Sequence, residues 1–439
     1  MPPNSPGASR KSLSELTQIK PGNLGAGSRL VPLALWITVL IWVIRVTVFV
    51  RQRPGSQFSE IDILAGVQIM MVFITIVILL VSGRALNVWG RISGTSVRFL
   101  FIYYFISALS MLWSPLPQFS LYRGVEFATF LMGVLVALSY SANLLKAEKT
   151  MLIVSTFVIL LSIYVNVHFH GFSTSLESWH TNSYSASAAI IFTYCLGEYF
   201  NSDKRRKRVL KWFGLLALCA LILGTSTASF FAAMAGMALI AFLKRSVVLL
   251  IVWMATLGVM VIAIFLLGTD LGGIRDFIFH GLSDEQIAGF HGRLPMWQQF
   301  MVLVQESPLI GHGFAVLSTG RGGVFSSSPH NSIFSILLGT GLTGLLVLII
   351  YVLKLLREFM RSTRERRPGA IGCAAAISTG LVNSLAMPLI FDEWEESSLV
   401  LVSVITFMTL YVILPYRKGK AQKKFSDTPS VDRSRQQAR

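Results

Sequence analysis

The residues best suited to chemistry in this chain are an arginine and a histidine in a polar stretch between two hydrophobic segments. Arg293 follows Gly292 in that stretch, and His330 stands at its end, between Pro329 and Asn331. A guanidinium keeps its charge and binds phosphate oxygens through a planar fork, whereas an imidazole can exchange a proton near neutral pH. The pair therefore suits chemistry on a lipid-linked phosphate, with Arg293 on the phosphate and His330 as a base.

Each of these two residues also has a purely structural interpretation. Arg293 could form a loop salt bridge with Asp284 or Glu285, and His330 could anchor or cap the helix that follows it. The positive end of that helix dipole disfavours protonation of His330, which favours a neutral base. Asn331 can accept hydrogen bonds from the first amides of the helix. From the residues alone, both interpretations stay open.

Further candidates for substrate contact lie in the same stretch or at the ends of other hydrophobic segments: Arg123, His180, Trp297, His312, Arg321 and Asn331. Arg123 could reach the same cavity as Arg293, or it could only pair with Glu126 one helical turn later. Arg321 lies among glycines, which is as compatible with a substrate clamp as with a solvated loop. Trp297 shares a helix face with Arg293, where packing is the simpler role.

The composition indicates that these residues must be positioned by membrane helices. The chain has 439 residues, of which 53% are hydrophobic and 13% charged, against about 25% charged residues in soluble domains. Twelve apolar runs are long enough to cross about 30 Å of hydrocarbon. They are 30–50, 61–82, 97–113, 124–142, 150–167, 183–200, 209–223, 225–243, 247–268, 330–353, 369–390 and 397–415.

The net charge of +17 reflects membrane topology and not nucleic-acid binding. With the N-terminus in the cytoplasm, most Lys and Arg fall in inner segments, every outer cation is an arginine, and all seven histidines lie outside. This asymmetry predicts that both termini are cytoplasmic. The basic runs 204–208 and 417–424 are then interpreted as topology signals and lipid contacts. The acidic cluster 392–396 is interpreted as a solvated outer loop, although it could also bind a cation or an acceptor hydroxyl.

These patterns predict an all-α integral membrane protein of about twelve transmembrane helices. We expect a cytoplasmic tail at 1–29, helices one to nine at 30–268, and a large periplasmic loop at 269–329. Helices ten to twelve follow at 330–415, with a basic cytoplasmic tail at 416–439. Within the loop, the apolar spacing of 295–306 predicts an amphipathic helix.

Several motifs for energy and metal chemistry are missing from the sequence. It contains no GxxxxGK[ST] loop, no Asp-x-Asp pair, no HExxH and no CxxC among its three cysteines. We therefore expect no ATP chemistry, no metal and no cofactor. Chemistry on the outer face must then take its driving force from a substrate that carries its own leaving group.

Four motifs together resemble the O-antigen ligase and polymerase superfamily of bacterial envelope glycan assembly. They are Gly292-Arg293 with Trp297, the run Pro308-Leu-Ile-Gly-His-Gly-Phe314, His330-Asn-Ser332 followed by 339–344, and Trp113-Ser-Pro115 with Arg123. The last resembles the exopolysaccharide-polymerase branch. One departure is that 223–229 offers no basic residue, where many members carry one at the outer end of a middle helix.

The resemblance implies a GT-C-like bundle that acts as a metal-independent, inverting glycosyltransferase of the bacterial inner membrane. The donor would be a glycan on undecaprenyl diphosphate and the acceptor a glycan hydroxyl at the periplasmic face. His330 would be the base and Arg293 would hold the diphosphate. Other glycan-assembly and chain-length proteins would be partners, and nucleic acid would not.

Three alternatives remain open at this point. The closest rival is a ligase onto lipid A-core, although the 113–115 patch favours a repeat-unit polymerase. A flippase or transporter of lipid-linked oligosaccharide is a rival from another class. It predicts charges distributed through the bundle interior, whereas only Arg45 is expected well inside a helix. An inactive scaffold subunit is the third alternative, because of the missing middle-helix cation.

Overall fold

The computed structural model describes the chain in several ranges, and these carry all the helices discussed below. The described residues are 30–48, 63–170, 182–248, 250–251, 253–255, 258, 293–315, 329–387, 389–390 and 396–414. Within them the elements are helical and no strand occurs. The elements run in the order α2 (Leu30–Val48), α3 (Ile63–Ser82), α4 (Arg84–Ile92), α5 (Val97–Leu109), η2 (Ser110–Leu112), α6 (Pro117–Ser139), α7 (Leu144–His170), α8 (Asn182–Tyr199), α9 (Lys204–Gly224), α10 (Thr227–Lys244), α14 (Arg293–Glu306), α15 (Ser332–Arg364), α16 (Ala370–Asn383), α17 (Glu396–Phe407) and η5 (Met408–Ile413).

Seven of the described helices are long and apolar enough to cross a membrane, and the pair α4 and α5, bent by 112°, makes an eighth if it forms one span. This agrees with a multi-pass helical membrane protein. The expected helices at 183–200, 209–223 and 369–390 exist as α8, α9 and α16 but do not meet the same measure of length and hydropathy. The segment 247–268 lies largely outside the described residues, so the total of twelve spans stays a prediction.

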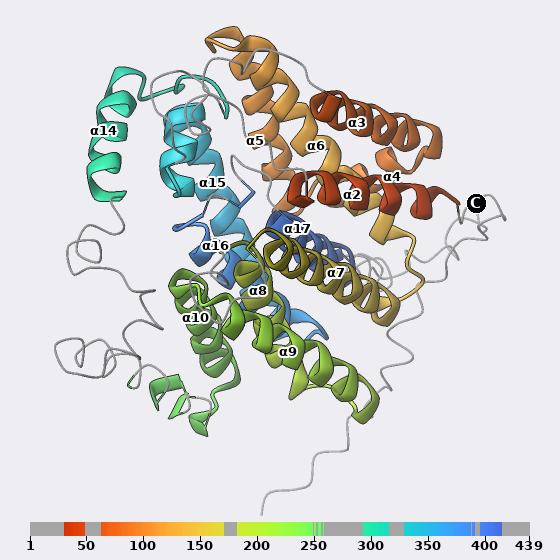
Figure 1. The fold of residues 1–439 in the computed structure, drawn as a ribbon. Coiled ribbons are helices and arrows are strands. Elements are labelled where there is room, and N and C mark those ends of the chain that lie inside the picture. The colour runs from red at the N-terminus through yellow and green to blue at the C-terminus, as the bar shows by residue number, and fades with distance from the viewer. Residues whose placement is uncertain are drawn as a thin grey trace, which may run out of the picture.

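The centre of the bundle is α17, whose twelve residues are all buried. It packs against α7, α8 and α6, while α8 also packs against α9, α16 and α10. Figure 1 shows α2 and α3 on one side of this centre, α9 and α10 on another, and α14 standing beside α15 at the edge. The exposed side chains of α3 include Phe73 and Leu80, as expected of a helix that faces lipid.

The two ends of the bundle differ in charge. Three contacts between helices identify one end. Arg206 at the start of α9 binds Glu148 on α7, and Lys244 at the end of α10 binds Asn201 after α8. The carboxylate of Glu358, near the end of α15, accepts from the amide of Ser96 before α5. We call this the basic end, and the positive-inside rule predicts that it is cytoplasmic. The starts of α8, α10 and α15 and the end of α16 lie at the opposite end, which we call the site end.

Helix α15 is broken at Gly341, where φ is 63° and ψ is −158°. In an unbroken helix the amides of Leu342 and Thr343 would bond to the carbonyls four residues earlier. Here they donate to the carbonyls of Pro308 and Leu309, at 2.8 and 3.1 Å. The break therefore leaves two carbonyls and two amides of α15 for another segment to satisfy.

The segment 307–315 satisfies all four of these groups. The amides of His312 and Gly313 donate to the freed carbonyls of Leu338 and Gly339, at 2.7 and 3.0 Å. Irregular backbone inside a membrane protein is stable only when its polar groups are paired in this way. The sequence predicted a continuous helix here, and the two motifs 308–314 and 339–344 are instead joined. We refer to these four hydrogen bonds as the stitch.

Two interpretations from the sequence are wrong for particular residues. Arg206, taken as part of a topology signal, is buried and donates to both Glu148 and Glu198, at distances of 2.5 to 3.0 Å. Glu198 in turn accepts from two amides at the start of α16. Glu396, taken as part of a solvated loop, is buried at the start of α17 and accepts from Ser162 on α7 at 3.2 Å. Residues 391–395 and 417–424 lie outside the described residues.

Candidate functional site

His330 and Arg293 lie near enough for their charges to interact. His330 has a left-handed backbone with φ of 48° and a partly exposed side chain, and Arg293 is half-buried at the first residue of α14. Partial burial, and next the Arg293 cation, hold the pKa of His330 below its usual value of 6.5. Burial also lowers the pKa of Arg293, which is ordinarily far above neutral pH, so that the group remains a cation. The site thus offers a neutral imidazole beside a fixed positive charge.

The amphipathic helix α14 brings Arg293 to this position. The predicted helix at 295–306 is confirmed, with Phe300 and Val304 buried against Leu338 of α15. Trp297 stacks on Phe334 with 5.7 Å between ring centroids. The indole nitrogen of Trp297 also donates to the carbonyl that precedes His330, at 3.0 Å. Trp297 therefore has the packing role expected of it, and its contacts fix α14 beside His330.

Asn331 holds the chain on the other side of the histidine. Its side-chain oxygen accepts from the amides of Ile333 and Phe334 at 2.8 and 3.3 Å, so its predicted capping role is confirmed. Its amide nitrogen donates to the carbonyl of Leu385 at 3.0 Å. The amide of Ser332 donates to the carbonyl of Ser384 at 2.9 Å. These bonds tie the start of α15 to the end of α16.

Two of the predicted motifs meet in space although about 200 residues separate them. The indole of Trp113 donates to the carbonyl of Ile310 at 3.1 Å, and the amide of Phe314 donates to the hydroxyl of Ser110 at 2.9 Å. Ser120 donates to the carbonyl of Phe314 at 3.1 Å. Phe314 is fully buried, edge-on to the ring of Phe127. The segment that forms the stitch is thus anchored to α6 as well as to α15.

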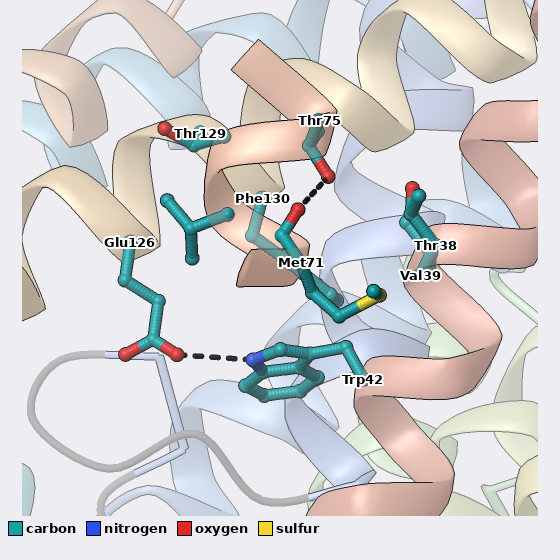
Figure 2. A pocket seen from close by; sticks show the side chains of 9 residues that line it. Thr38, Val39, Trp42, Met71, Thr75, Glu126, Thr129 and Phe130 are labelled. Atoms are coloured by element: carbon teal, nitrogen blue, oxygen red, sulfur yellow. Dashed lines mark hydrogen bonds between the residues drawn. The ribbon is translucent and has the colours of Figure 1, made fainter. Parts of the chain in front are cut away.

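Arg123 forms a buried ion pair at this end of α6. Its guanidinium lies 2.6 Å from Glu126, and the exposed side-chain fractions are 13% and 1%. The indole of Trp42 on α2 donates to the Glu126 carboxylate at 3.0 Å, as Figure 2 shows, and Gln68 on α3 donates to it as well. A small cavity beside Glu126 has room for about one water. Arg123 therefore forms the ion pair with Glu126 that its structural interpretation predicted. Contact of Arg123 with a substrate stays a prediction.

His312 is also engaged by the protein. One of its ring nitrogens lies 2.8 Å from the carbonyl of Leu303 in α14, and its backbone amide belongs to the stitch. His180 and Arg321 lie outside the described residues, and their predicted contacts with substrate are untested. Among the described residues, no group of three or more potential metal ligands occurs.

A polar cluster at the site end was missed by the sequence reasoning. Asn182 at the start of α8 accepts from Ser226 at 2.6 Å, and Asn383 at the end of α16 donates to Ser229 on α10 at 3.0 Å. The signal for it is the set of small hydroxyl residues in 223–229, which can form hydrogen bonds between helices. Side-chain hydrogen bonds of this kind hold membrane helices together, and Ser384 links the cluster to the start of α15.

Residues 212–349 match the family model described as O-antigen ligase. The matched region includes the second half of α9, all of α10 and α14, the stitch and both His330 and Arg293. No curated protein matches the chain.

Proposed function

Through residues 212–349 the chain belongs to the O-antigen ligase and polymerase superfamily, and we propose that it transfers a glycan from undecaprenyl diphosphate to a sugar hydroxyl at the periplasmic face. The observation that carries this proposal is the neutral His330 beside the Arg293 cation within the matched region. The coarser conclusion, a membrane glycosyltransferase of ligase or polymerase type, follows from the family alone.

In the proposed reaction, His330 removes the proton of the acceptor hydroxyl. The acceptor oxygen forms a bond to the anomeric carbon of the donor glycan, while the bond from that carbon to the diphosphate oxygen breaks. Arg293 holds the diphosphate, on which negative charge develops as it leaves. A single displacement inverts the anomeric carbon. The protein thus supplies a positioned base and a positioned cation, and the donor supplies the driving force.

The electrostatic coupling between the two residues favours an order in which the donor binds before His330 removes the proton. In the free protein, burial and next the Arg293 cation lower the pKa of His330, which favours the unprotonated imidazole. A bound diphosphate would offset the charge of Arg293 and raise the pKa of His330. The base would then become stronger when the donor is in place.

A second cation for the diphosphate is still required, and Arg123 or Arg321 could supply it. For Arg123, the variants Arg123→Met, Glu126→Met and the double variant separate a structural from a catalytic role. Breaking a buried pair costs about 3–5 kcal/mol, whereas replacing both partners by apolar residues is often neutral. Trp42 and Gln68 also donate to Glu126, so the reference for the double variant is Glu126→Met. If Arg123 only pairs with Glu126, the double variant has at least the protein level and the activity of Glu126→Met; if Arg123 binds the donor, the double variant keeps that level but loses activity.

Within the family, we propose a repeat-unit polymerase, with a ligase onto lipid A-core as the alternative. The contact of Trp113 with Ile310 supports the polymerase, because it puts the polymerase-like patch next to the segment beside the site. Deleting the gene distinguishes the two. A polymerase deletion leaves single repeat units, whereas a ligase deletion leaves full-length polymer on the lipid carrier.

A flippase or transporter of lipid-linked oligosaccharide remains the rival from another class. The expectation that only Arg45 lies well inside a helix does not hold for Glu126 of α6. Glu198 and Arg206 are buried too, but they lie at the end of α8 and the start of α9. The described buried acids, however, are bound by partners from the protein, as Glu126 is by Arg123 and Glu198 by Arg206. Such pairs indicate fixed contacts between helices more than a path for a substrate.

The proposal is tested by substitution in cells. His330→Ala and Arg293→Ala should each abolish polymer while the protein level stays normal, and His168→Ala, an exposed histidine on α7, should change neither. Wild-type chain lengths from either site variant would exclude these residues as the catalytic pair. Loss of function in all three variants would point to a general effect on assembly, which an inactive scaffold also predicts.

A further inference from the structure

A wide groove opens at the basic end of the bundle, far from His330 along α15. It is lined by the end of α10, the residues that follow it and the last turns of α15, and its volume is about 690 Å³. Volumes of a few hundred Å³ are typical of sites for small organic ligands. The groove belongs to neither the site nor the ion pairs described above.

The floor of the groove is apolar. Ala238, Phe242 and Leu250 line one side and Met360 the other, and the side chains of Phe242 and Met360 are 77% and 64% exposed. An exposed apolar surface of this kind on a membrane helix is covered by hydrocarbon. The floor therefore fits an acyl chain.

The rim of the groove is cationic. Arg245 and Arg364 both line it, both have exposed side chains, and Ser246 and Thr363 lie next to them. No acidic residue is among the described residues that line the groove. Arginine binds phosphate oxygens through two parallel hydrogen bonds, and hydroxyls add further donors. The rim therefore fits a phosphate group.

The backbone at Arg245 adds an independent observation. Arg245 ends α10 in the left-handed region, with φ of 50°. Glycine is the usual residue at such a position because a Cβ atom is disfavoured there. A long cationic side chain at a strained position suggests that the side chain has a role which the fold itself does not require.

We propose that this groove binds a phospholipid with an anionic headgroup from the membrane leaflet at the basic end. Its phosphate lies between Arg245 and Arg364, and one acyl chain runs along the floor between α10 and α15. The bound lipid joins α10 to the half of α15 that follows the break, which is the half that the stitch connects to the site. The proposal does not depend on the glycan reaction.

Binding to the full-length purified protein tests the proposal. Delipidated protein in a neutral detergent is titrated with phosphatidylglycerol, with phosphatidylcholine and with inorganic phosphate, and bound lipid is counted by native mass spectrometry. Each surface arginine contributes about 1 kcal/mol to anionic lipid binding, or about fivefold in affinity. We expect Arg245→Gly and Arg364→Ala each to weaken phosphatidylglycerol binding about fivefold, and the double variant about thirtyfold.

Two further variants separate the groove from general attraction to a basic surface. Arg91→Ala removes one exposed charge from α4 at the same end and should leave the affinity unchanged. Ala238→Trp fills the floor while keeping both arginines, and it should weaken binding as strongly as the double variant. Arg245→Gly relieves backbone strain, so it should fold at least as well as the wild type in lipid-free detergent.

The proposal is overturned by any of three results. Equal affinity for phosphatidylcholine would show that the headgroup charge is not recognised. Displacement of the lipid by millimolar inorganic phosphate would show an anion site without a lipid floor. An effect of Arg91→Ala equal to that of Arg364→Ala would show nonspecific attraction to the basic end.

Discussion

Gly341→Ala should break the link between the 307–315 segment and helix α15. The backbone of Gly341 has φ of 63° and ψ of −158°, a region that essentially only glycine adopts. A Cβ atom there would lie 2.4 Å from the carbonyl carbon of Leu309 and 2.6 Å from the amide nitrogen of Ile310. Both atoms belong to the peptide unit whose carbonyl oxygen, that of Leu309, accepts from Thr343 in the stitch, so this unit cannot move aside without breaking that bond.

The magnitude follows from two terms. The backbone conformation costs about 1–3 kcal/mol for a residue with a side chain. Displacing Leu309 removes at least the hydrogen bonds made by the amides of Leu342 and Thr343, at about 1 kcal/mol each. The free energy of unfolding should therefore fall by about 3–5 kcal/mol. Because the stitch also positions α14, glycan transfer should fall with it.

Equilibrium unfolding in mixed detergent and SDS measures this difference, with Gly66→Ala as the matched control. Gly66 lies within helix α3, and a Cβ there would meet no atom within 4 Å. Alanine at that position should leave stability unchanged or raise it by up to about 1 kcal/mol. A loss below about 1 kcal/mol for Gly341→Ala would refute the account of the stitch.

Three further predictions concern other parts of the molecule. Arg293→Gln should raise the pKa of His330. Carbethoxylation modifies only the neutral imidazole, so the increase in its rate with pH should occur at higher pH in this variant than in the wild type. An unchanged pH profile would contradict the coupling. Arg206→Ala should lower the unfolding free energy by about 3–5 kcal/mol and the exposed neighbour Arg208→Ala by at most about 0.5, and equal losses would mean that the buried network is not what stabilises this end. Trp297→Phe keeps the stacked ring but removes the indole hydrogen bond; misplacing the histidine should lower kcat by up to about a hundredfold at normal protein level, and a wild-type kcat would show that this bond is dispensable.

The sequence predicted the parts of the site that depend on local rules. The spacing of apolar residues predicted α14 and its buried face, and the position of Asn331 just before an apolar run predicted the helix cap. The proximity of Arg293 and His330 was inferred from residue chemistry and the family resemblance. It is realised because α14 folds back on α15, a long-range contact whose local signal is only the amphipathic pattern.

The features that sequence reasoning missed depend on long-range pairing. The apolar run through Gly341 indicated one continuous helix, and only the backbone of residues 308–313 shows why it breaks. Likewise, Arg206 stands in a run of basic residues that charge counting assigns to lipid, whereas its partners Glu148 and Glu198 come from two other helices. The pattern along the sequence indicates which residues lie within the membrane and which lie at its surface. It does not indicate which residue, far away in the sequence, a side chain binds.

The most direct test of the central claim is turnover by the purified full-length protein. The wild type, His330→Gln and Arg293→Gln are each incubated with a glycan on undecaprenyl diphosphate and an acceptor glycan, and released undecaprenyl diphosphate is measured together with the elongated product. We predict equal amounts of both products from the wild type, and a loss of at least about a hundredfold in each variant. Turnover by His330→Gln at the wild-type rate, or no turnover by well-folded wild-type protein, would contradict the account.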